Sequence, residues 1–286
     1  MSAPPLSTAV GTERPGFLKE GGFDLRVGCS GWGYEAWLGH FYPKDLDKSA
    51  FLRTYSKVFD LVEIDSSFYR TPSPSMCADW YRQTPPGFTF TAKWPKRITH
   101  DAKLRNVFDS MEYFYRSVSQ LQEKLGPLCV QLPPSLKYDK DWEALQTFVG
   151  HFDKRFAHAI EFRHVSWFRK DVYELLRDNS VALVWATTQY LDTPPEVTAD
   201  YVYLRMIGDR ELTEFGTIQR DKKEEMRAWY GNLEKAKTGS KGALVFFNNH
   251  YAGFGPASVN EFRRLAGLMD LEFPVAGKRQ RSLDAF

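Results

Sequence analysis

Eight short apolar runs recur along the chain, and stretches with helical periodicity separate most of them. Each run is bounded by Gly, Pro, Asp or a polar cluster, which is typical of β-strands. The runs cover residues 25–31, 61–67, 88–94, 127–133, 158–164, 181–187, 201–207 and 243–249. Strands that alternate with helices form parallel sheets, and eight of them predict closure into a TIM-barrel-like (β/α)8 fold. The length of 286 residues suits one barrel of this kind.

The clearest helical pattern lies between the third and fourth runs. Six apolar residues follow a helical period there: Val107, Met111, Phe114, Val118, Leu121 and Leu125. Gly126 comes next, where a C-terminal cap is expected. Weaker patterns cover residues 49–59, 75–83, 141–150, 168–178, 222–236 and 258–269. The segment after the sixth run contains Pro194 and Pro195 and has no helical period, so we expect its helix to be missing or degenerate.

Composition places the chain among folded proteins of one domain. Residues 1–22 are rich in Pro, Gly, Ser and Thr and predict a flexible leader, followed by a barrel over 23–275 and a flexible tail over 276–286. Three cysteines without metal-type spacing indicate reduced thiols. No stretch resembles a signal peptide or a membrane span, so we expect a cytoplasmic protein without a membrane partner. A formal charge of +2 neither requires nor excludes nucleic acid.

Polar residues interrupt several predicted strands at positions that face the barrel lumen. The outer side of a parallel barrel strand packs under helices and is apolar, so strand alternation assigns the other positions to the inside. This parity places eight polar residues in the lumen: Ser30, Glu63, Asp65, Lys93, Gln131, Glu161, Arg163 and Arg205. The eighth run offers no clean alternation.

The lumen residues lie near the C-terminal ends of their strands, where barrel enzymes place their active sites. Converging charges are costly to desolvate unless they pair with one another or with a ligand. One interpretation is a salt-bridge lattice that fills the barrel, with the two glutamates opposite Lys93, Arg163 and Arg205. The other is a ligand site, and the contribution of polar residues from several strands at the same end favours it.

Two predicted loops supply aromatic side chains and cations beside this end of the barrel. They follow the first and third runs and carry Trp32, Tyr34, Trp37, Trp94, Lys96, Arg97 and His100. Aromatic faces next to cations suit bases, sugars or nucleotides. The alternative for any one of these aromatics is simple packing in a lid.

Six motifs occur in order between about residue 24 and residue 270: VGCSGWGYEAWLGHFYP, VEIDSSFYRTP, FTAKWPKRITH, GPLCVQLPPS, AIEFRHVSW and FFNNHYAGFGP. Together they resemble the YecE-like family, formerly called domain of unknown function 72. The resemblance implies a TIM-barrel-like fold and no agreed activity. The motifs bring these residues to the family's characteristic positions: Tyr34, Trp37, Glu63, Phe68, Tyr69, Lys93, His100, Gln131, Glu161, Arg163, His164, Trp167, Asn248 and Asn249. Asp65 departs from the Asn associated with the second motif.

We predict from these features a site that binds or processes nucleic acid or a phosphate-bearing substrate, in the manner of a phosphodiesterase or nuclease. The expected catalytic residues are Glu63, Glu161, Lys93 and His100, which supply acids, bases and charge. The expected substrate-binding residues are Ser30, Trp32, Tyr34, Asp65, Tyr69, Gln131, Arg163, His164, Arg205, Asn248 and Asn249. One Mg²⁺ or Mn²⁺ on the carboxylates is compatible with this set, and no nucleotide-cofactor signature is present.

Two other functions fit the same residues. The first is a small-molecule isomerase, lyase or hydrolase, in which Glu63 and Glu161 perform acid–base chemistry on a sugar or Lys93 forms a Schiff base. The second is a barrel that binds a ligand without converting it. A deep, closed pocket would favour a small molecule, whereas an open groove with a basic rim would favour nucleic acid.

The chain ends in KRQRSLDAF, where Gln280, Leu283 and Phe286 follow at steps of three. Residues three apart eclipse in a 3₁₀ turn, so Leu283 and Phe286 would form one apolar plug. The pattern resembles the peptide with which DNA replication and repair proteins bind the sliding clamp PCNA, although it has one terminal aromatic in place of two. The alternative is a basic tail that matches by chance. A PCNA partner would indicate a role in DNA repair and an archaeal or eukaryotic source, of which the archaeal one fits the family resemblance.

Overall fold

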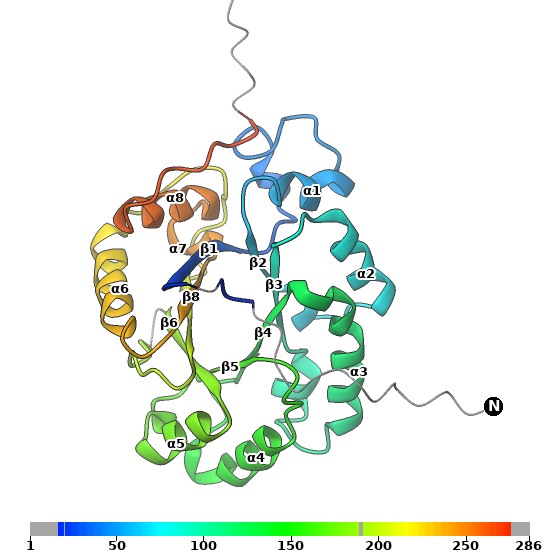
Figure 1. Ribbon diagram of the computed structural model, residues 1–286, viewed down its shortest axis with the longest axis vertical. Coiled ribbons are helices and arrows are strands. Elements are labelled where there is room, and N and C mark those ends of the chain that lie inside the picture. The colour runs from blue at the N-terminus through cyan, green and yellow to red at the C-terminus, as the bar shows by residue number, and fades with distance from the viewer. Residues whose placement is uncertain (1–16, 20, 189–190, 276–286) are drawn as a thin grey trace, which may run out of the picture.

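The computed structural model describes residues 17–19, 21–188 and 191–275. Within these ranges eight parallel strands pair in sequence order, and the last pairs with the first to close a barrel (Figure 1). The strands are β1 (Asp24–Ser30), β2 (Leu61–Ile64), β3 (Thr89–Lys93), β4 (Leu125–Gln131), β5 (His158–Glu161), β6 (Val181–Thr188), β7 (Tyr201–Gly208) and β8 (Gly242–Phe247). The predicted TIM-barrel-like fold is therefore confirmed.

Helices surround the barrel and connect most of its strands (Figure 1). They are α1 (Phe51–Tyr55), α2 (Pro74–Gln83), α3 (Phe108–Val118), α4 (Tyr138–Gly150), α5 (Lys170–Asp178), α6 (Lys223–Ala236), α7 (Asn249–Ala252) and α8 (Gly255–Leu265). The described part of the β6–β7 connection, residues 191–200, contains no helix, as expected from Pro194 and Pro195. None of the described helices has the length and apolar character needed to cross a lipid bilayer.

Helix α3 ends earlier than the sequence period indicates. After Val118 the chain takes 3₁₀ turns over Ser119–Lys124, and Gln122 departs from helical geometry with a φ of 51°. Gly126 lies inside β4, so the prediction that it caps the helix is wrong. A Cβ at this position would lie 2.8 Å from the side chain of Thr89 on the neighbouring strand, and close strand packing explains the glycine.

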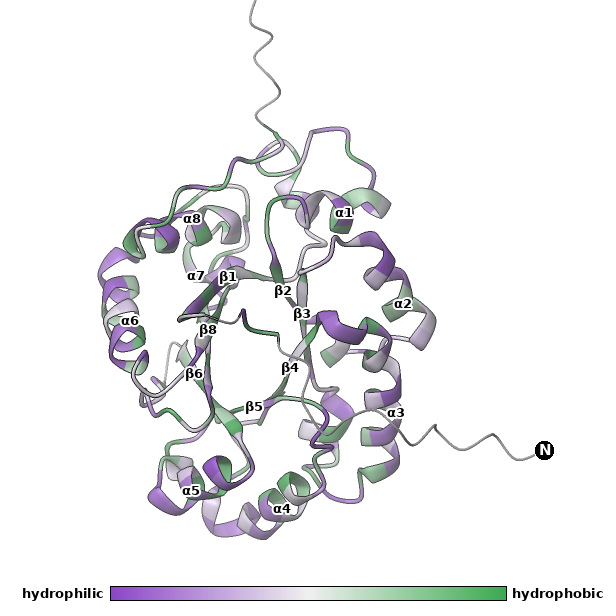
Figure 2. Ribbon diagram, in the orientation of Figure 1, coloured by the Kyte–Doolittle hydropathy of each residue, from purple (hydrophilic) through white to green (hydrophobic). Residues whose placement is uncertain are grey.

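The buried residues form two clusters, one on each side of the strands. The larger cluster lies between the barrel and the helices and includes Val62, Ile64 and Phe247. The smaller one fills the lumen with Leu61, Cys129, Ala157, Ala159, Ala182, Val184, Ala186, Tyr201, Tyr203, Leu244 and Phe246. Successive strand residues therefore face opposite sides, as predicted. Green and purple segments alternate along the outer helices, as expected for helices with one face on the barrel (Figure 2).

The N-terminal end of the barrel is closed by apolar residues and a buried arginine. Phe17 and Leu18, which the sequence analysis assigned to the leader, pack against the lumen cluster. The ring of Phe17 lies 5.1 Å from that of Tyr201. Arg26 donates to Thr89 Oγ1 at 2.7 Å. A ligand therefore has access to the barrel from the opposite end, where the strands terminate.

Candidate functional site

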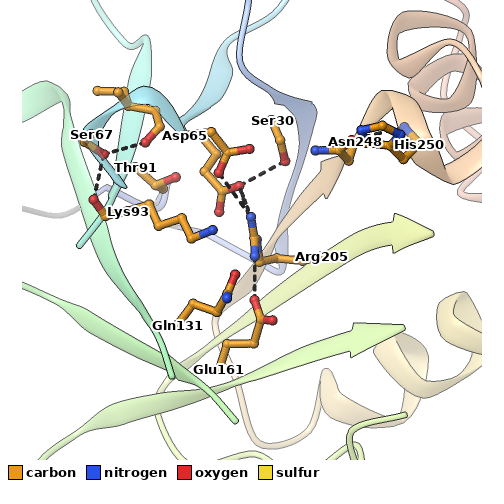
Figure 3. A network of polar contacts seen from close by, with 12 residues as sticks. Ser30, Asp65, Ser67, Thr91, Lys93, Gln131, Glu161, Arg205, Asn248 and His250 are labelled. Atoms are coloured by element: carbon orange, nitrogen blue, oxygen red, sulfur yellow. Dashed lines mark hydrogen bonds and ion pairs between the residues drawn. The ribbon is translucent and has the colours of Figure 1, made fainter. Parts of the chain in front are cut away.

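Arg205 on β7 lies at the centre of a buried polar network in the lumen (Figure 3). Its Nη2 lies 2.7 Å from Oε2 of Glu63, and its Nη1 lies 2.5 Å from Oε2 of Glu161. A third carboxylate, Asp65, approaches Nη2 at 3.2 Å. The arginine side chain is 3% exposed and both glutamates are 0% exposed. One guanidinium thus joins carboxylates from opposite sides of the barrel.

Neighbouring side chains also contact the two glutamates. Tyr203 donates to Glu63 Oε1 at 2.7 Å, and Ser30 donates to Glu63 Oε2 at 2.9 Å. Arg163 forms an ion pair with Oε1 of Glu161. We call this set, Ser30, Glu63, Asp65, Glu161, Arg163, Tyr203 and Arg205, the Arg205 network. For the two glutamates, this network agrees with the interpretation of the lumen charges as a salt-bridge lattice.

The three carboxylates of the Arg205 network have different proton affinities. Burial opposes ionisation of Glu161, but the charges of Arg163 and Arg205 outweigh it and lower its pKa to about 2. Burial likewise opposes ionisation of Glu63, and Arg205 holds its pKa below the ordinary value. At Asp65, burial and the negative charge of Glu63 raise the pKa to about 6. The glutamates therefore stay ionised, while Asp65 exchanges a proton near neutral pH.

A cavity of about 690 Å³, here called the mouth cavity, lies at the C-terminal end of the barrel. It is lined by Tyr34, Asp65, Tyr69, Lys93, Gln131, Arg163, Thr188, Arg205, Ile207, Gly208, Asp209, Arg210, Phe215, Asn248, Asn249 and His250. A second hollow of about 730 Å³ lies on the outer surface, between Leu104 and helix α4, and none of its lining residues faces the lumen. The mouth cavity is therefore the one that adjoins the buried charges.

Lys93 at the end of β3 extends its ammonium group towards the centre of the site (Figure 3). Its Nζ lies 4.3 Å from the ring centroid of Phe68. Within the described part of the chain, Lys93 has no carboxylate at ion-pair distance, because Glu63, Glu161 and Asp65 pair with arginines. Burial and the charge of Arg205 lower the pKa of Lys93.

Two asparagines at the end of β8 present amide groups to the mouth cavity. Oδ1 of Asn248 accepts from the backbone N–H of His250 at 3.0 Å. Oδ1 of Asn249 accepts from Nε1 of Trp37 at 3.1 Å and from the N–H of Gly255 at 2.9 Å. Two obligate donors fix the orientation of the Asn249 amide. Its buried Nδ2 has no hydrogen-bond partner among the residues that the structure describes.

The loop after β7 supplies lining residues that the sequence analysis missed. Asp209, Arg210 and Phe215 belong to it, and its Leu212 carbonyl lies 2.9 Å from Nδ1 of His250. This contact places a proton on Nδ1, so in the neutral form of the ring Nε2 is the acceptor. No periodicity marks such a loop in a sequence. Ile207 and Thr188, also missed, continue the lumen parity of β7 and β6, so a longer alternation would have identified them.

Nine residues predicted for the site line the mouth cavity: Tyr34, Asp65, Tyr69, Lys93, Gln131, Arg163, Arg205, Asn248 and Asn249. Ser30, Glu63 and Glu161 lie beneath it, buried in the Arg205 network. Predicted binding residues therefore gather at one place, although two of the predicted catalytic carboxylates do not reach the cavity surface.

Three predicted residues lie outside the lining. Trp32 packs edge-on against Trp80, with ring centroids 5.4 Å apart. The ring of His100 packs edge-on against Phe68, the ring that Lys93 also contacts. His164 accepts from the backbone N–H of Ser166 and caps the 3₁₀ turn Val165–Trp167. The three side chains therefore lie outside the lining of the mouth cavity, and their roles in a site stay predictions.

The predicted metal site falls on residues that the structure describes, whereas the predicted clamp-binding residues do not. Among the described residues, no group of three or more His, Cys, Asp and Glu side chains is arranged to hold a metal ion. The donor set also fits poorly, because guanidinium groups already bind the carboxylates of the lumen. Gln280, Leu283 and Phe286 lie outside the described residues, so clamp binding remains a prediction from the sequence.

The barrel and its charged lumen belong to a known class of protein. A family model described as "Protein of unknown function DUF72" matches residues 26–281, and the chain belongs to this family. A solved structure of a DUF72 family protein from Thermotoga maritima is 30% identical, with a TM-score of 0.74 over 85% of this chain and 99% of that one. A DUF72 family protein from Enterococcus faecalis, 21% identical with a TM-score of 0.68, shares the fold.

Curated relatives give the same family assignment. The UPF0759 protein YunF of Bacillus subtilis is 24% identical over 291 residues, which cover 92% of this chain and 100% of YunF. The UPF0759 protein YecE of Escherichia coli K12 is 31% identical over 146 residues, 51% of each chain. The resemblance inferred from the six motifs is thus confirmed at the level of the family.

Proposed function

We propose that the mouth cavity binds a small phosphate-bearing molecule and that Asp65 and Lys93 perform acid–base chemistry on it. The observation that carries this proposal is that two cations of the cavity lining lack an ion-pair partner among the described residues. Lys93 and Arg210 line the cavity and form no ion pair with any residue that the structure describes. Cations without protein counterions favour an anionic ligand, and phosphate accepts hydrogen bonds from both lysine and arginine.

The size of the mouth cavity supports a small molecule. Its volume of about 690 Å³ lies within the range of ordinary ligand pockets. The Arg205 network closes the floor, and Phe215 from the loop after β7 lines the wall together with Tyr34. The rings of these two residues lie 6.3 Å apart. Such a site suits a sugar-sized compound with one phosphate better than a nucleic-acid strand.

The two groups proposed for proton transfer are less buried than the glutamates. Asp65 is 26% exposed on the cavity wall, and its raised pKa of about 6 suits a group that gains and loses a proton near neutrality. Lys93 has a lowered pKa and no counterion in the described chain. Glu63 and Glu161 stay ionised beneath the floor, so we assign them to positioning Arg205.

The nucleic-acid function predicted from the sequence would require a different arrangement of basic and aromatic residues. A strand needs a continuous basic groove with aromatic platforms. Tyr69, 79% exposed at the rim, is such a platform, and Arg70 follows it. Because Lys93 lies within the cavity and the exposed Arg210 lines the same cavity, we favour the small molecule and use an oligonucleotide as the competing ligand in the test.

The test compares glycerol 3-phosphate, glycerol and a single-stranded DNA oligonucleotide by calorimetry on the full-length protein. We expect the phosphate ester to bind and glycerol to give no heat. Arg210→Gln should weaken ester binding about tenfold, the effect of losing one charge-assisted hydrogen bond. Arg227→Gln, on the exposed side of α6, is the matched control and should bind as the wild type does.

Equal affinity of the wild type and the Arg210→Gln variant for the ester would overturn the proposal. So would tighter binding of the oligonucleotide than of the ester, which would restore the nucleic-acid function.

A further inference from the structure

We propose that Lys93 is a nucleophile that forms a Schiff base with the carbonyl carbon of a phosphate-bearing aldehyde or ketone. The inference rests on the proposed function, because the phosphate site is what brings the carbonyl group to the lysine. It adds a reaction class, covalent imine chemistry, and a substrate class, phosphorylated carbonyl compounds of sugar size.

The position of Lys93 is fixed by its strand and by a neighbouring serine. Oγ of Ser67 lies 2.6 Å from the carbonyl oxygen of Lys93 and 2.7 Å from that of Ile64, which joins the ends of β3 and β2 (Figure 3). The ammonium group rests 4.3 Å above the Phe68 ring. A cation–π contact orients the protonated side chain without a carboxylate partner.

Of the two neighbouring cations Arg205 and Lys93, Lys93 is the one that can lose its proton. A guanidinium stays protonated throughout the physiological range, whereas a buried lysine loses its proton readily. Arg205 pairs with Glu63 and Glu161, and Arg163 also pairs with Glu161. A lysine that served only to neutralise the lumen would pair with one of these carboxylates. Burial and the adjacent guanidinium lower its pKa and so enlarge the fraction of neutral amine.

The reaction balances with groups that face the mouth cavity. Lys93 first gives its ammonium proton to ionised Asp65. The neutral amine then attacks the carbonyl carbon, a C–N bond forms as the C=O π bond breaks, and a proton moves from the attacking nitrogen to the carbonyl oxygen to give a carbinolamine. Asp65 in its protonated form donates a proton to the hydroxyl, which leaves as water while the C=N bond forms. Counted from the ammonium ion, lysine and carbonyl compound give iminium and water. The charge at Nζ is the same before and after, and no oxidant or reductant is consumed.

Other lining residues match the remaining parts of such a substrate. Arg210 and Arg163 supply donors for the phosphate. Nδ2 of Asn249, which has no partner in the described chain, is a donor for a hydroxyl or carbonyl oxygen. Nε2 of His250 accepts from a hydroxyl, because Nδ1 donates to Leu212. The cavity that contains the Lys93 amine thus also has groups that can bind the phosphate, carbonyl and hydroxyl groups of the substrate.

The test is reductive trapping with dihydroxyacetone phosphate on the full-length protein. The probe and sodium borohydride are added together, and the protein is digested for peptide mass analysis. We expect an adduct on the peptide that contains Lys93, with the mass of the probe less one oxygen atom. Unphosphorylated dihydroxyacetone should label this peptide at least tenfold less, and Arg210→Gln should reduce labelling by the phosphorylated probe by about the same factor.

The matched control is Lys96, three residues on and 52% exposed. Lys96→Arg should trap as the wild type does, and Lys93→Arg should abolish the adduct while keeping the wild-type unfolding temperature. Equal labelling of Lys93 and Lys96 in the wild-type protein would overturn the inference, whatever the variants do. If glycerol 3-phosphate binds as proposed but Lys93 is not trapped, the Schiff base falls and the phosphate site stands. If the ester does not bind and no adduct forms, both fall.

Discussion

Nη2 of Arg205 lies 2.7 Å from Oε2 of Glu63, and the two side chains reach each other across the barrel lumen from β7 and β2. Both are buried, and Nη1 of the same arginine binds Glu161. The two interpretations of the lumen charges, a salt-bridge lattice and a ligand site, therefore apply to different residues. The glutamates and Arg205 form an internal lattice, while Lys93, Asp65 and the loop residues above them form the cavity in which we place a ligand.

Replacing Arg205 tests the lattice. In the Arg205→Met variant Glu63 and Glu161 lose a shared counterion while remaining buried, which should lower the free energy of unfolding by about 3–5 kcal/mol. Urea denaturation at pH 7 measures the effect. Arg227→Met on α6, whose partner Glu224 is exposed, should leave the midpoint unchanged. A shift of the Arg205→Met midpoint no larger than that of the control would rule out a structural role for the network.

The raised pKa of Asp65 predicts a pH dependence of stability. Because the folded protein raises this pKa from 3.8 to about 6, protonation favours the folded state. The contribution is complete below pH 3.8 and is lost as the pH rises through 6. Asp65→Asn should remove this slope and increase the free energy of unfolding at pH 7 by up to about 3 kcal/mol.

Urea denaturation between pH 5 and pH 7 isolates this effect. The lowered pKa of Glu161 acts in the opposite sense and lower in the range, because its contribution is lost only as the pH falls from 4.5 towards about 2. Parallel pH profiles for the wild type and Asp65→Asn would show that Asp65 titrates normally in the folded protein.

Gly208 is a position where β7 and α7 approach too closely for a side chain. Its φ is +72°, and a Cβ would lie 2.4 Å from the carbonyl oxygen of His250. Gly208→Ala should therefore lower the free energy of unfolding by about 2–4 kcal/mol and displace His250 from the cavity. Gly231→Ala in α6 has open space around it and should raise stability by about 0.5–1 kcal/mol. Thermal unfolding of both variants checks the contrast, and equal effects would contradict it.

The C-terminal tail allows a test that is independent of the barrel. Truncation after Gly277 should abolish binding to purified PCNA and leave the unfolding temperature unchanged, because the removed segment follows the last described helix. The double variant Leu283→Ala/Phe286→Ala should have the same effect, since it removes the apolar plug. Ser282→Ala, between the motif positions, is the control. Binding that survives the truncation would exclude the tail as the clamp ligand.

Much of the site could be predicted because strand parity is local. Val62 and Ile64 must face the helices, so Glu63 faces the lumen whatever the rest of the chain does. Some residues of the cavity lining without a sequence period were not predicted. The loop that carries Arg210 and Phe215 has no such period, and His100, which was predicted for the site, contacts Phe68 and is not among the lining residues.

The sequence by itself determined the barrel, the lack of a helix in the described part of the β6–β7 connection and the residues that face inwards, because each follows from the residue pattern along a single segment. Only the tertiary structure decided which of the inward charges pair. Register places Glu63 beside Ser30 and Glu161 beside Gln131, and closure of the barrel brings Arg205 to both glutamates. Lys93 faces the lumen as these residues do, but among the described residues it has no carboxylate at ion-pair distance, because distances between strands are not encoded in any local pattern.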